Sequence, residues 1–147
     1  MKKVTVIGSG SWGTALAVML AENGHEVFIW SRRQDAVDEL LKERTNKKYL
    51  PGVVIPDSIQ ATTDRKEAVD GADIVILAVP SRAVAQTVRD FAPYPKAETL
   101  FLLSDVIKRE APQCEVCVLS GPSHAEEVAR KVPTACLIAC ENEAVAK

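Results

Sequence analysis

The sequence predicts a doubly wound α/β fold, in which helices cover both faces of a mostly parallel sheet. Short apolar runs alternate with helical patterns along the chain, as in strand–helix–strand units. The run Asp73–Val79 is apolar almost throughout, as expected for a strand buried on both faces of a parallel sheet. The first apolar run, Val4–Ile7, passes directly into a glycine-rich turn and a helical pattern. Because ligands of such sheets bind outside the carboxyl ends of the strands, these ends are the first place to search for a site.

The size and composition of the chain indicate one globular domain over residues 1–147, with 47% hydrophobic and 26% charged residues. A net charge of −2 gives no electrostatic reason to expect nucleic acid or an acidic membrane as a partner. The apolar run after Met1-Lys2-Lys3 is too short for a signal peptide. No segment reaches the roughly 20 apolar residues of a membrane span. A cytoplasmic location is therefore expected.

Strands and helices are predicted from the period of their apolar residues. The strands are predicted at Lys3–Ile7, Glu26–Trp30, Ile59–Thr62, Asp73–Val79, Glu115–Leu119 and Thr134–Cys140. The helices are predicted at Ser11–Glu22, Ser31 to about Glu43, Asp64 to Val69, Ser81 to about Phe91, Thr99–Arg109 and Ser123–Lys131. Loops or turns are predicted at Thr45–Pro56 and Ala92–Lys96, which are rich in proline and polar residues.

Polar caps and helix breakers set the predicted helix ends. Asn23-Gly24 is a good carboxyl-terminal cap for the first helix. Ser31, Asp64 and Ser123 are each followed three residues later by Gln or Glu, which is the capping-box pattern, so each is predicted to begin a helix. Pro80-Ser81 ends the central strand and begins the helix after it.

The turn after the first strand has the spacing G-x-G-x-x-G between a strand and a helix, which predicts dinucleotide binding. Gly8 allows the sharp turn, Gly10 lets a pyrophosphate approach the backbone, and Gly13 lets the helix pack closely on the strands. The free amides from Ser11 onward and the helix dipole favour the negative charge. Trp12 either covers the cofactor or wedges beside the sheet, and both positions keep it near the pyrophosphate.

The end of the second strand predicts which nicotinamide cofactor is used. NAD-selective sites usually place a carboxylate there to bind the ribose 2′-hydroxyl, whereas a 2′-phosphate is better bound by arginine. Here Ser31 is followed by Arg32 and Arg33, so NADP or NAD is expected, with NADP slightly favoured and Arg32 as the first contact. Tyr49 is expected either over the adenine or against the edge of the sheet. Pro80 is expected to lie toward the nicotinamide.

A second turn, Gly121-Pro122, follows the strand that ends at Leu119 and precedes a helix. The amino terminus of that helix could hold a phosphate-bearing substrate or the cofactor amide, or could be ordinary capping. His124 is a tempting general acid or base, but no carboxylate is placed by the sequence to orient it. We expect a lining or partly buried histidine instead.

The four cysteines, Cys114, Cys117, Cys136 and Cys140, have a spacing that invites a zinc site or a redox pair. Cys117, Cys136 and Cys140 fall in predicted strands, where free cysteine is a common small core residue. Zinc ligands usually come from turns, and the second pair lacks a glycine-rich knuckle. No metal site is therefore predicted.

Four segments together resemble the bacterial-type NAD(P)-dependent glycerol-3-phosphate dehydrogenases, over nearly the whole chain. They are the glycine-rich turn with Trp12-Gly13-Thr14-Ala15, Tyr49-Leu50-Pro51-Gly52, Val79-Pro80-Ser81 and Leu119-Ser120-Gly121-Pro122-Ser123 continuing to Ala129. The resemblance implies a Rossmann-like cofactor-binding domain of an enzyme that reversibly reduces dihydroxyacetone phosphate to sn-glycerol 3-phosphate for phospholipid synthesis. A homodimer of the full-length enzyme is one possible assembly.

The resemblance also assigns residues to the two ligands. The cofactor would be met by Ser11, Trp12, Arg32, Arg33 and Tyr49, and Ala125 would contact it near its reactive end. Gly121 and Ser123 would lie at the substrate. No catalytic residue is assigned within this chain.

The chain departs from this family in two ways. The helical second domain, which supplies the catalytic lysine, is absent from this chain, so the fragment is expected to bind cofactor without turnover. A strand and a Lys-Gly segment of the family are also absent between Lys96 and Thr99. Either that strand is deleted or a stretch is missing from the sequence, and we favour the second because a deleted strand would leave a gap in the sheet. A stand-alone NAD(P)-binding or sensor module and a different two-domain dehydrogenase remain alternatives.

Overall fold

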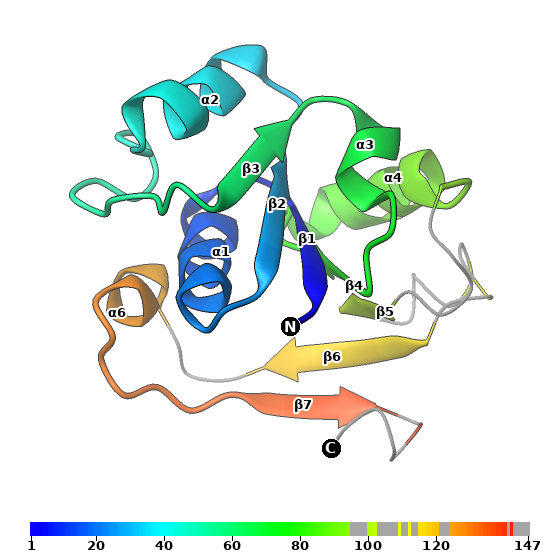
Figure 1. The fold of residues 1–147 in the computed structure, drawn as a ribbon. Helices are drawn as coiled ribbons and strands as arrows, with labels where there is room; N and C mark the ends of the chain where they lie inside the picture. The colour runs from blue at the N-terminus through cyan, green and yellow to red at the C-terminus, as the bar shows by residue number, and fades with distance from the viewer. Residues whose placement is uncertain are drawn as a thin grey trace.

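The computed structural model of the chain describes residues 1–94, 100–102, 109, 112, 115–120, 124–140 and 142. Seven strands form one sheet in the order β3-β2-β1-β4-β5-β6-β7 (Figure 1). The strands are β1 (Lys3–Ile7), β2 (Glu26–Trp30), β3 (Ile59–Thr62), β4 (Ile74–Leu77), β5 (Leu100–Leu102), β6 (Val116–Ser120) and β7 (Leu137–Cys140). All neighbouring strands are parallel except β6 and β7, which run antiparallel.

Helices cover both faces of this sheet, which confirms the predicted fold class. They are α1 (Ser11–Glu22), α2 (Gln34–Asp38), its π-helical continuation η1 (Glu39–Glu43), α3 (Arg65–Val69), α4 (Ser81–Phe91) and α6 (Ala125–Ala129). Figure 1 shows α1 and α6 on one side of the sheet and α3 and α4 on the other. Two apolar cores result: Val84, Val88 and Phe91 of α4 pack on one face, and Leu16, Ala17 and Val18 of α1 pack on the other. No helix in the described part of the chain is long and apolar enough to cross a bilayer.

The predicted ends of α1 and α3 are confirmed by their caps. At the end of α1, the His25 amide donates to the Leu20 carbonyl (3.1 Å) and the Gly24 amide to the Ala21 carbonyl (3.0 Å). With Gly24 at φ +83°, this is a Schellman cap. At the start of α3, the Asp64 carboxylate accepts a hydrogen bond from the Glu67 amide at 2.8 Å.

Two other predicted caps are wrong. The residue that caps α2 is Arg33, and neither Ser31 nor any other side chain caps that helix, because the Ser31 hydroxyl is engaged by Ser9 instead. α6 begins at Ala125 with His124 as its cap, and not at Ser123. The capping-box pattern predicts a local hydrogen bond, and at Ser31 a hydroxyl from another segment takes its place.

The predicted helix Thr99–Arg109 is also wrong at its start, because Leu100–Leu102 form a parallel strand between β4 and β6. Residues 103–108 lie outside the described part. An apolar triplet can join either a helix or a buried strand, and here the place between β4 and β6 is filled by the strand. The sheet therefore has no gap at this point, and the reason for preferring a missing stretch over a deletion does not hold. Three predicted strands differ from the structure mainly at their ends: β4 and β7 are shorter, and β6 is shifted by one residue.

Candidate functional site

The carboxyl ends of β1, β2 and β4 meet around the glycine-rich turn. The Gly8 amide donates to the Trp30 carbonyl at the end of β2 (2.9 Å), and the Ala78 amide beyond β4 donates to the Ile7 carbonyl (2.9 Å). The strand order reverses here, because β2 lies on one side of β1 and β4 on the other. Such a switch point is where open α/β sheets bind their ligands.

Each glycine of the turn is in a different environment. Gly8 has a φ of +120°, and a Cβ added there would lie 2.4 Å from the Ala78 carbonyl oxygen, so the sharp turn needs glycine. A Cβ on Gly13 would lie 2.2 Å from the Gly8 carbonyl oxygen, so close packing of α1 on the turn also needs glycine. A Cβ on Gly10 would meet no atom within 4 Å. Packing therefore does not require glycine at Gly10, and the open space above it fits a group that approaches the backbone.

The amino terminus of α1 suits an anion. Gly10 caps the helix without a side chain, and the first turn contains no acidic residue. The Thr14 amide makes the first hydrogen bond of the helix, to the Gly10 carbonyl at 3.0 Å. The amides of the first turn, from Ser11 to Gly13, precede this bond, and the positive end of the helix dipole adds to them. Diphosphate oxygens are the kind of group that this arrangement binds.

A network of hydrogen bonds joins the turn to the segments around it. The Ser9 hydroxyl donates to the Ser31 hydroxyl oxygen (2.9 Å), which also accepts from the Arg33 amide (3.3 Å). The Asn46 side-chain amide donates to the Ser9 carbonyl (3.0 Å) and to the Thr14 hydroxyl oxygen (2.8 Å). The turn, the end of β2 and the loop after η1 are thus one connected unit.

The two arginines after β2 differ in their partners. The Arg33 guanidinium forms a two-pronged ion pair with Asp35, with its Nε 2.9 Å from the carboxylate. This pair raises the pKa of Arg33 and lowers the pKa of Asp35, through their shared hydrogen bonds and charges. Arg32 is exposed, and its guanidinium makes no hydrogen bond or ion pair with any described residue. Arg32 is therefore the more available cation for a phosphate.

Tyr49 lies beside the same segments. Its side chain is 42% exposed, with the Lys48 ammonium 5.1 Å from the ring centre, so it is not buried against the sheet edge. Tyr49 lines a small pocket with Ser9, Arg33, Asn46 and Lys48, together with Ala36, Glu39 and Leu40. The next residue, Leu50, is fully buried in a cluster with Ala15 of α1 and Ala125 and Val128 of α6. The loop is thereby fixed to both helices.

The remaining predicted residues that the structure describes lie around the carboxyl ends of the strands. Trp12 is partly buried and packs against the cluster around Leu50 as well as the core beneath α1. Pro80 caps α4 three residues after the end of β4, and Ala125 is the first residue of α6. Gly121 and Ser123 lie outside the described residues. His124 is exposed at the cap of α6, so the partly buried histidine is not found, and a lining role stays a prediction.

The cysteines are only partly the core residues that the sequence predicts. Cys117 is buried in β6 opposite Cys140 of β7, and burial together with a hydrogen bond to Cys140 raises the pKa of its thiol to about 12. Cys136 is exposed and precedes β7, so its predicted place in a strand is wrong. Cys114 lies outside the described residues. Within the described part of the chain, no group of three or more metal-binding side chains is found.

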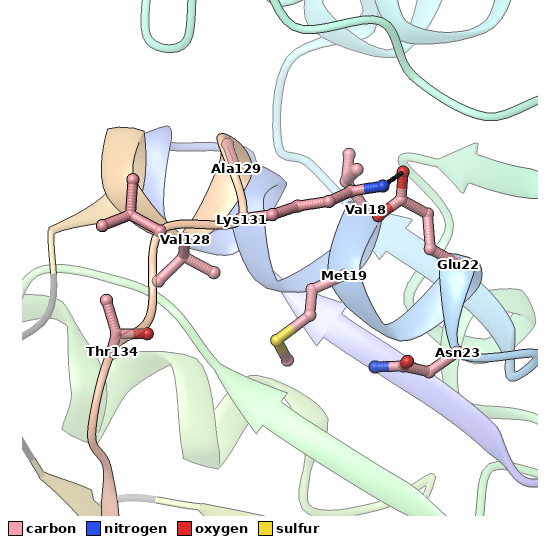
Figure 2. A pocket seen from close by; sticks show the side chains of 9 residues that line it. Val18, Met19, Glu22, Asn23, Val128, Ala129, Lys131 and Thr134 are labelled. Carbon is pink, nitrogen blue, oxygen red and sulfur yellow. Dashed lines mark ion pairs between the residues drawn. The ribbon is translucent and has the colours of Figure 1, made fainter.

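A larger pocket lies at the other end of α1 (Figure 2). Its volume is about 330 Å³, and it lies between the last turn of α1 and the end of α6, with Val18, Met19 and Val128 on its walls. An ion pair between Lys131 and Glu22 (3.1 Å) stands at this pocket. We call the region around the glycine-rich turn, the end of β2 and Tyr49 the crevice. Because the glycine-rich turn is at the opposite end of α1, the larger pocket is not part of this crevice.

Asn46 is a site residue that the sequence does not identify, because the sequence predicts only a loop there. A weak signal is present: asparagine often accepts a hydrogen bond from a backbone amide a few residues on, and Asn46 precedes Tyr49 by three positions. Its contacts with Ser9 and Thr14, which are distant in the sequence, have no local signature. For Ser31 the sequence predicts only a helix cap.

Comparison with known proteins agrees with this geometry. The family described as NAD-dependent glycerol-3-phosphate dehydrogenase N-terminus matches residues 3–146. Glycerol-3-phosphate dehydrogenase [NAD(P)+] of Bacillus pumilus is 43% identical to the chain, over 97% of this chain and 46% of that protein. The corresponding protein of Bacillus subtilis is 42% identical, over 91% of this chain and 44% of that protein. The chain thus spans about half the length of the curated relatives it matches.

Solved structures give the same result. A crystal structure of glycerol-3-phosphate dehydrogenase from Coxiella burnetii superposes with a TM-score of 0.91 at 35% identity, covering 98% of this chain and 48% of that chain. The yeast glycerol-3-phosphate dehydrogenase gives a TM-score of 0.84 at 26% identity, covering 95% of this chain and 47% of that chain.

One alignment with a curated relative is longer than this chain. The match to the protein of Shouchella clausii extends over 164 positions and includes 100% of this chain, which has 147 residues. That relative therefore contains residues with no counterpart here.

Proposed function

The chain belongs to the NAD-dependent glycerol-3-phosphate dehydrogenase family, and from this premise we propose that it is the cofactor-binding part of such an enzyme. The observation that carries the proposal is the amino terminus of α1, which follows Gly10 at the switch point of the sheet. No side chain caps it, and the space at Gly10 is open. The described residues fit a dinucleotide: the first-turn amides of α1 would hold its diphosphate, and Arg32 and Tyr49 would face its adenosine half.

The reaction that we propose for the whole enzyme is the reversible reduction of dihydroxyacetone phosphate to sn-glycerol 3-phosphate, in the cytoplasm and for phospholipid synthesis. When bound, NAD(P)H would supply the hydride for the C2 carbonyl of the substrate. The role of this chain is to position the cofactor, with Pro80 and Ala125 on the nicotinamide side. Gly121 and Ser123 remain the predicted substrate contacts. A homodimer of the full-length enzyme stays a prediction.

We further propose that NADP is slightly preferred over NAD. The support is that the end of β2 presents no carboxylate to a ribose 2′-hydroxyl, and that the Arg32 guanidinium is exposed without a partner among the described residues. A guanidinium binds phosphate oxygens through a planar pair of donors. Arg33 is paired with Asp35, so we expect it to contribute less than Arg32 to binding the 2′-phosphate.

Parallel calorimetric titrations with NADPH and NADH test the proposal, on the chain itself and on its Arg32→Ala variant. We expect Arg32→Ala to weaken NADPH binding by about 1–3 kcal/mol, as for the loss of a charge-assisted contact, and NADH binding far less. Arg130→Ala is the matched control, because Arg130 lines a pocket near Glu22 at the opposite end of α1. Absence of heat with both cofactors would refute the proposal.

Turnover gives a second test. We expect the 147 residues on their own to oxidise no NADPH in the presence of dihydroxyacetone phosphate, because they span about half the length of the curated relatives. A substantial rate would contradict the assignment as a binding part. It would favour instead a chain that carries its own catalytic group.

A further inference from the structure

Asn46 is a buried polar residue in a loop whose neighbours are exposed. Its side chain is 5% exposed, whereas Lys47, Lys48 and Tyr49 are all exposed. Both hydrogens of its side-chain amide are used, by the Ser9 carbonyl (3.0 Å) and by the Thr14 hydroxyl oxygen (2.8 Å). Its side-chain oxygen accepts from the Tyr49 amide at 3.3 Å. A buried amide with every hydrogen satisfied is held in one orientation.

These partners belong to three different segments. Ser9 lies between the first two glycines of the turn, Thr14 lies in the first turns of α1, and Tyr49 lies in the loop after η1. The Asn46 carbonyl also accepts from the Leu50 amide (2.8 Å), which closes the loop into a compact turn. One side chain therefore sets the distance between the glycine-rich turn and Tyr49.

Leu50 alone does not explain this arrangement. Its apolar side chain holds the loop to α1 and α6 by packing with Ala15, Ala125 and Val128, which fixes the loop in place but is not directional. The hydrogen bonds of Asn46 are directional and reach the turn itself. The Ser9 hydroxyl then continues the network to Ser31 and the Arg33 amide, so the segment with the two arginines belongs to the same unit.

We propose that Asn46 is a positioning residue for cofactor binding, which holds the Tyr49 loop at the right distance from the diphosphate-binding turn. This inference rests on the proposed function. Asn46 acts through other residues, because all its side-chain hydrogens are taken by protein groups. Loss of the Asn46 side chain would let Tyr49, which we propose faces the adenosine half of the cofactor, move relative to the glycine-rich turn. The apolar packing of Leu50 would still hold the loop to α1 and α6.

The test measures dissociation constants of NADPH and of adenosine 2′,5′-bisphosphate for the chain and for Asn46→Ala. We expect both ligands to bind Asn46→Ala about tenfold more weakly, which corresponds to about 1.4 kcal/mol. Thr5→Val is the matched control, because Thr5 is also fully buried and its hydroxyl donates to the Ala68 carbonyl, away from the crevice. That variant should lose stability but keep its affinity within about twofold.

Hydrogen exchange gives a readout that a general loss of stability would not move in the same way. Asn46→Ala should lose protection at the Tyr49 and Leu50 amides, whereas Thr5→Val should keep it. If Asn46→Ala does not fold, Thr14→Val removes one partner of the amide and should weaken NADPH binding by about two- to fivefold. The inference would be overturned if Asn46→Ala, or Thr14→Val in its place, bound NADPH as tightly as the unaltered chain. It would also be overturned if Thr5→Val weakened NADPH binding by the same factor. If the unaltered chain binds neither ligand, the proposed function itself fails.

Discussion

The centre of the sheet and its β6–β7 edge are built differently. Around β1, β2 and β4 the strands are buried on both faces, and their apolar side chains form the two cores beneath the helices. At the β6–β7 edge, Leu137 is 67% exposed and Ile138 is 49% exposed, and Val118 is exposed as well. The residues around the glycine-rich turn therefore rest on strands that are buried on both faces, whereas the β6–β7 edge adds Val116 and Cys117 of β6 to the cores and leaves most of β7 exposed.

The largest expected difference comes from truncating one apolar side chain at the centre of the sheet and one at its β6–β7 edge. Leu77→Ala should cost about 3 kcal/mol of unfolding free energy, because Leu77 is fully buried in β4 and its loss leaves a cavity. Ile138→Ala should cost less than about 1 kcal/mol, since half of that side chain is already exposed. Urea denaturation of both variants measures the difference. Equal losses of unfolding free energy would show that the centre and the β6–β7 edge are equally well packed.

Gly10 and Gly13 differ in what surrounds them, so alanine should affect stability and binding differently at the two positions. Gly13→Ala should destabilise the fold by about 1–3 kcal/mol, because the new methyl group would overlap the Gly8 carbonyl. Gly10→Ala should leave stability within about 0.5 kcal/mol, because the added atom meets nothing within 4 Å, yet it should weaken NADPH binding. Thermal unfolding and titration of the two variants separate packing from binding. A Gly10→Ala variant that binds normally would contradict the role given to the open space.

The smallest predicted effect concerns Asp35. Asp35→Asn removes the charge that competes for the Arg33 guanidinium, so NADPH should bind about two- to threefold more tightly, as for an exposed ion pair. NADH binding should change less. Asp38→Asn is the matched control, because Asp38 is paired with Lys42 one turn along the same helical segment. The same gain in both variants would point to net charge rather than to Arg33.

Local sequence patterns predict most of the strands and helices around the glycine-rich turn. β1, β2, β3, α1 and α4 have the predicted bounds, because buried strands and clear helix breakers leave few alternatives there. Asp64 caps α3 as predicted because its hydrogen-bond partner is only three residues away. The predicted site residues that are described lie around one end of the sheet, as the parallel topology requires. Their contacts with ligands stay predictions.

Contacts between segments that are distant in the chain explain what the sequence could not predict. The Ser31 hydroxyl matched a local cap but bonds to Ser9, which lies on a different strand–helix unit. Leu100–Leu102 became a strand because of its neighbours β4 and β6, and not because of its own pattern. The partners of Asn46 in the turn and in α1 are far from it in the chain. Such contacts can be found only once the fold is known.

The burial of Leu50 also has a consequence for the order of folding. Its partners come from α1 near the start of the chain and from α6 near its end, so this cluster can form only after distant segments have met. Contacts between distant segments are slow to form, because a long loop must first close. A nascent chain that has emerged from the ribosome only as far as α4 would have the glycine-rich turn but no α6 to cover Leu50. The loop that carries Tyr49 and Leu50 is therefore among the last parts of the molecule to take its final shape.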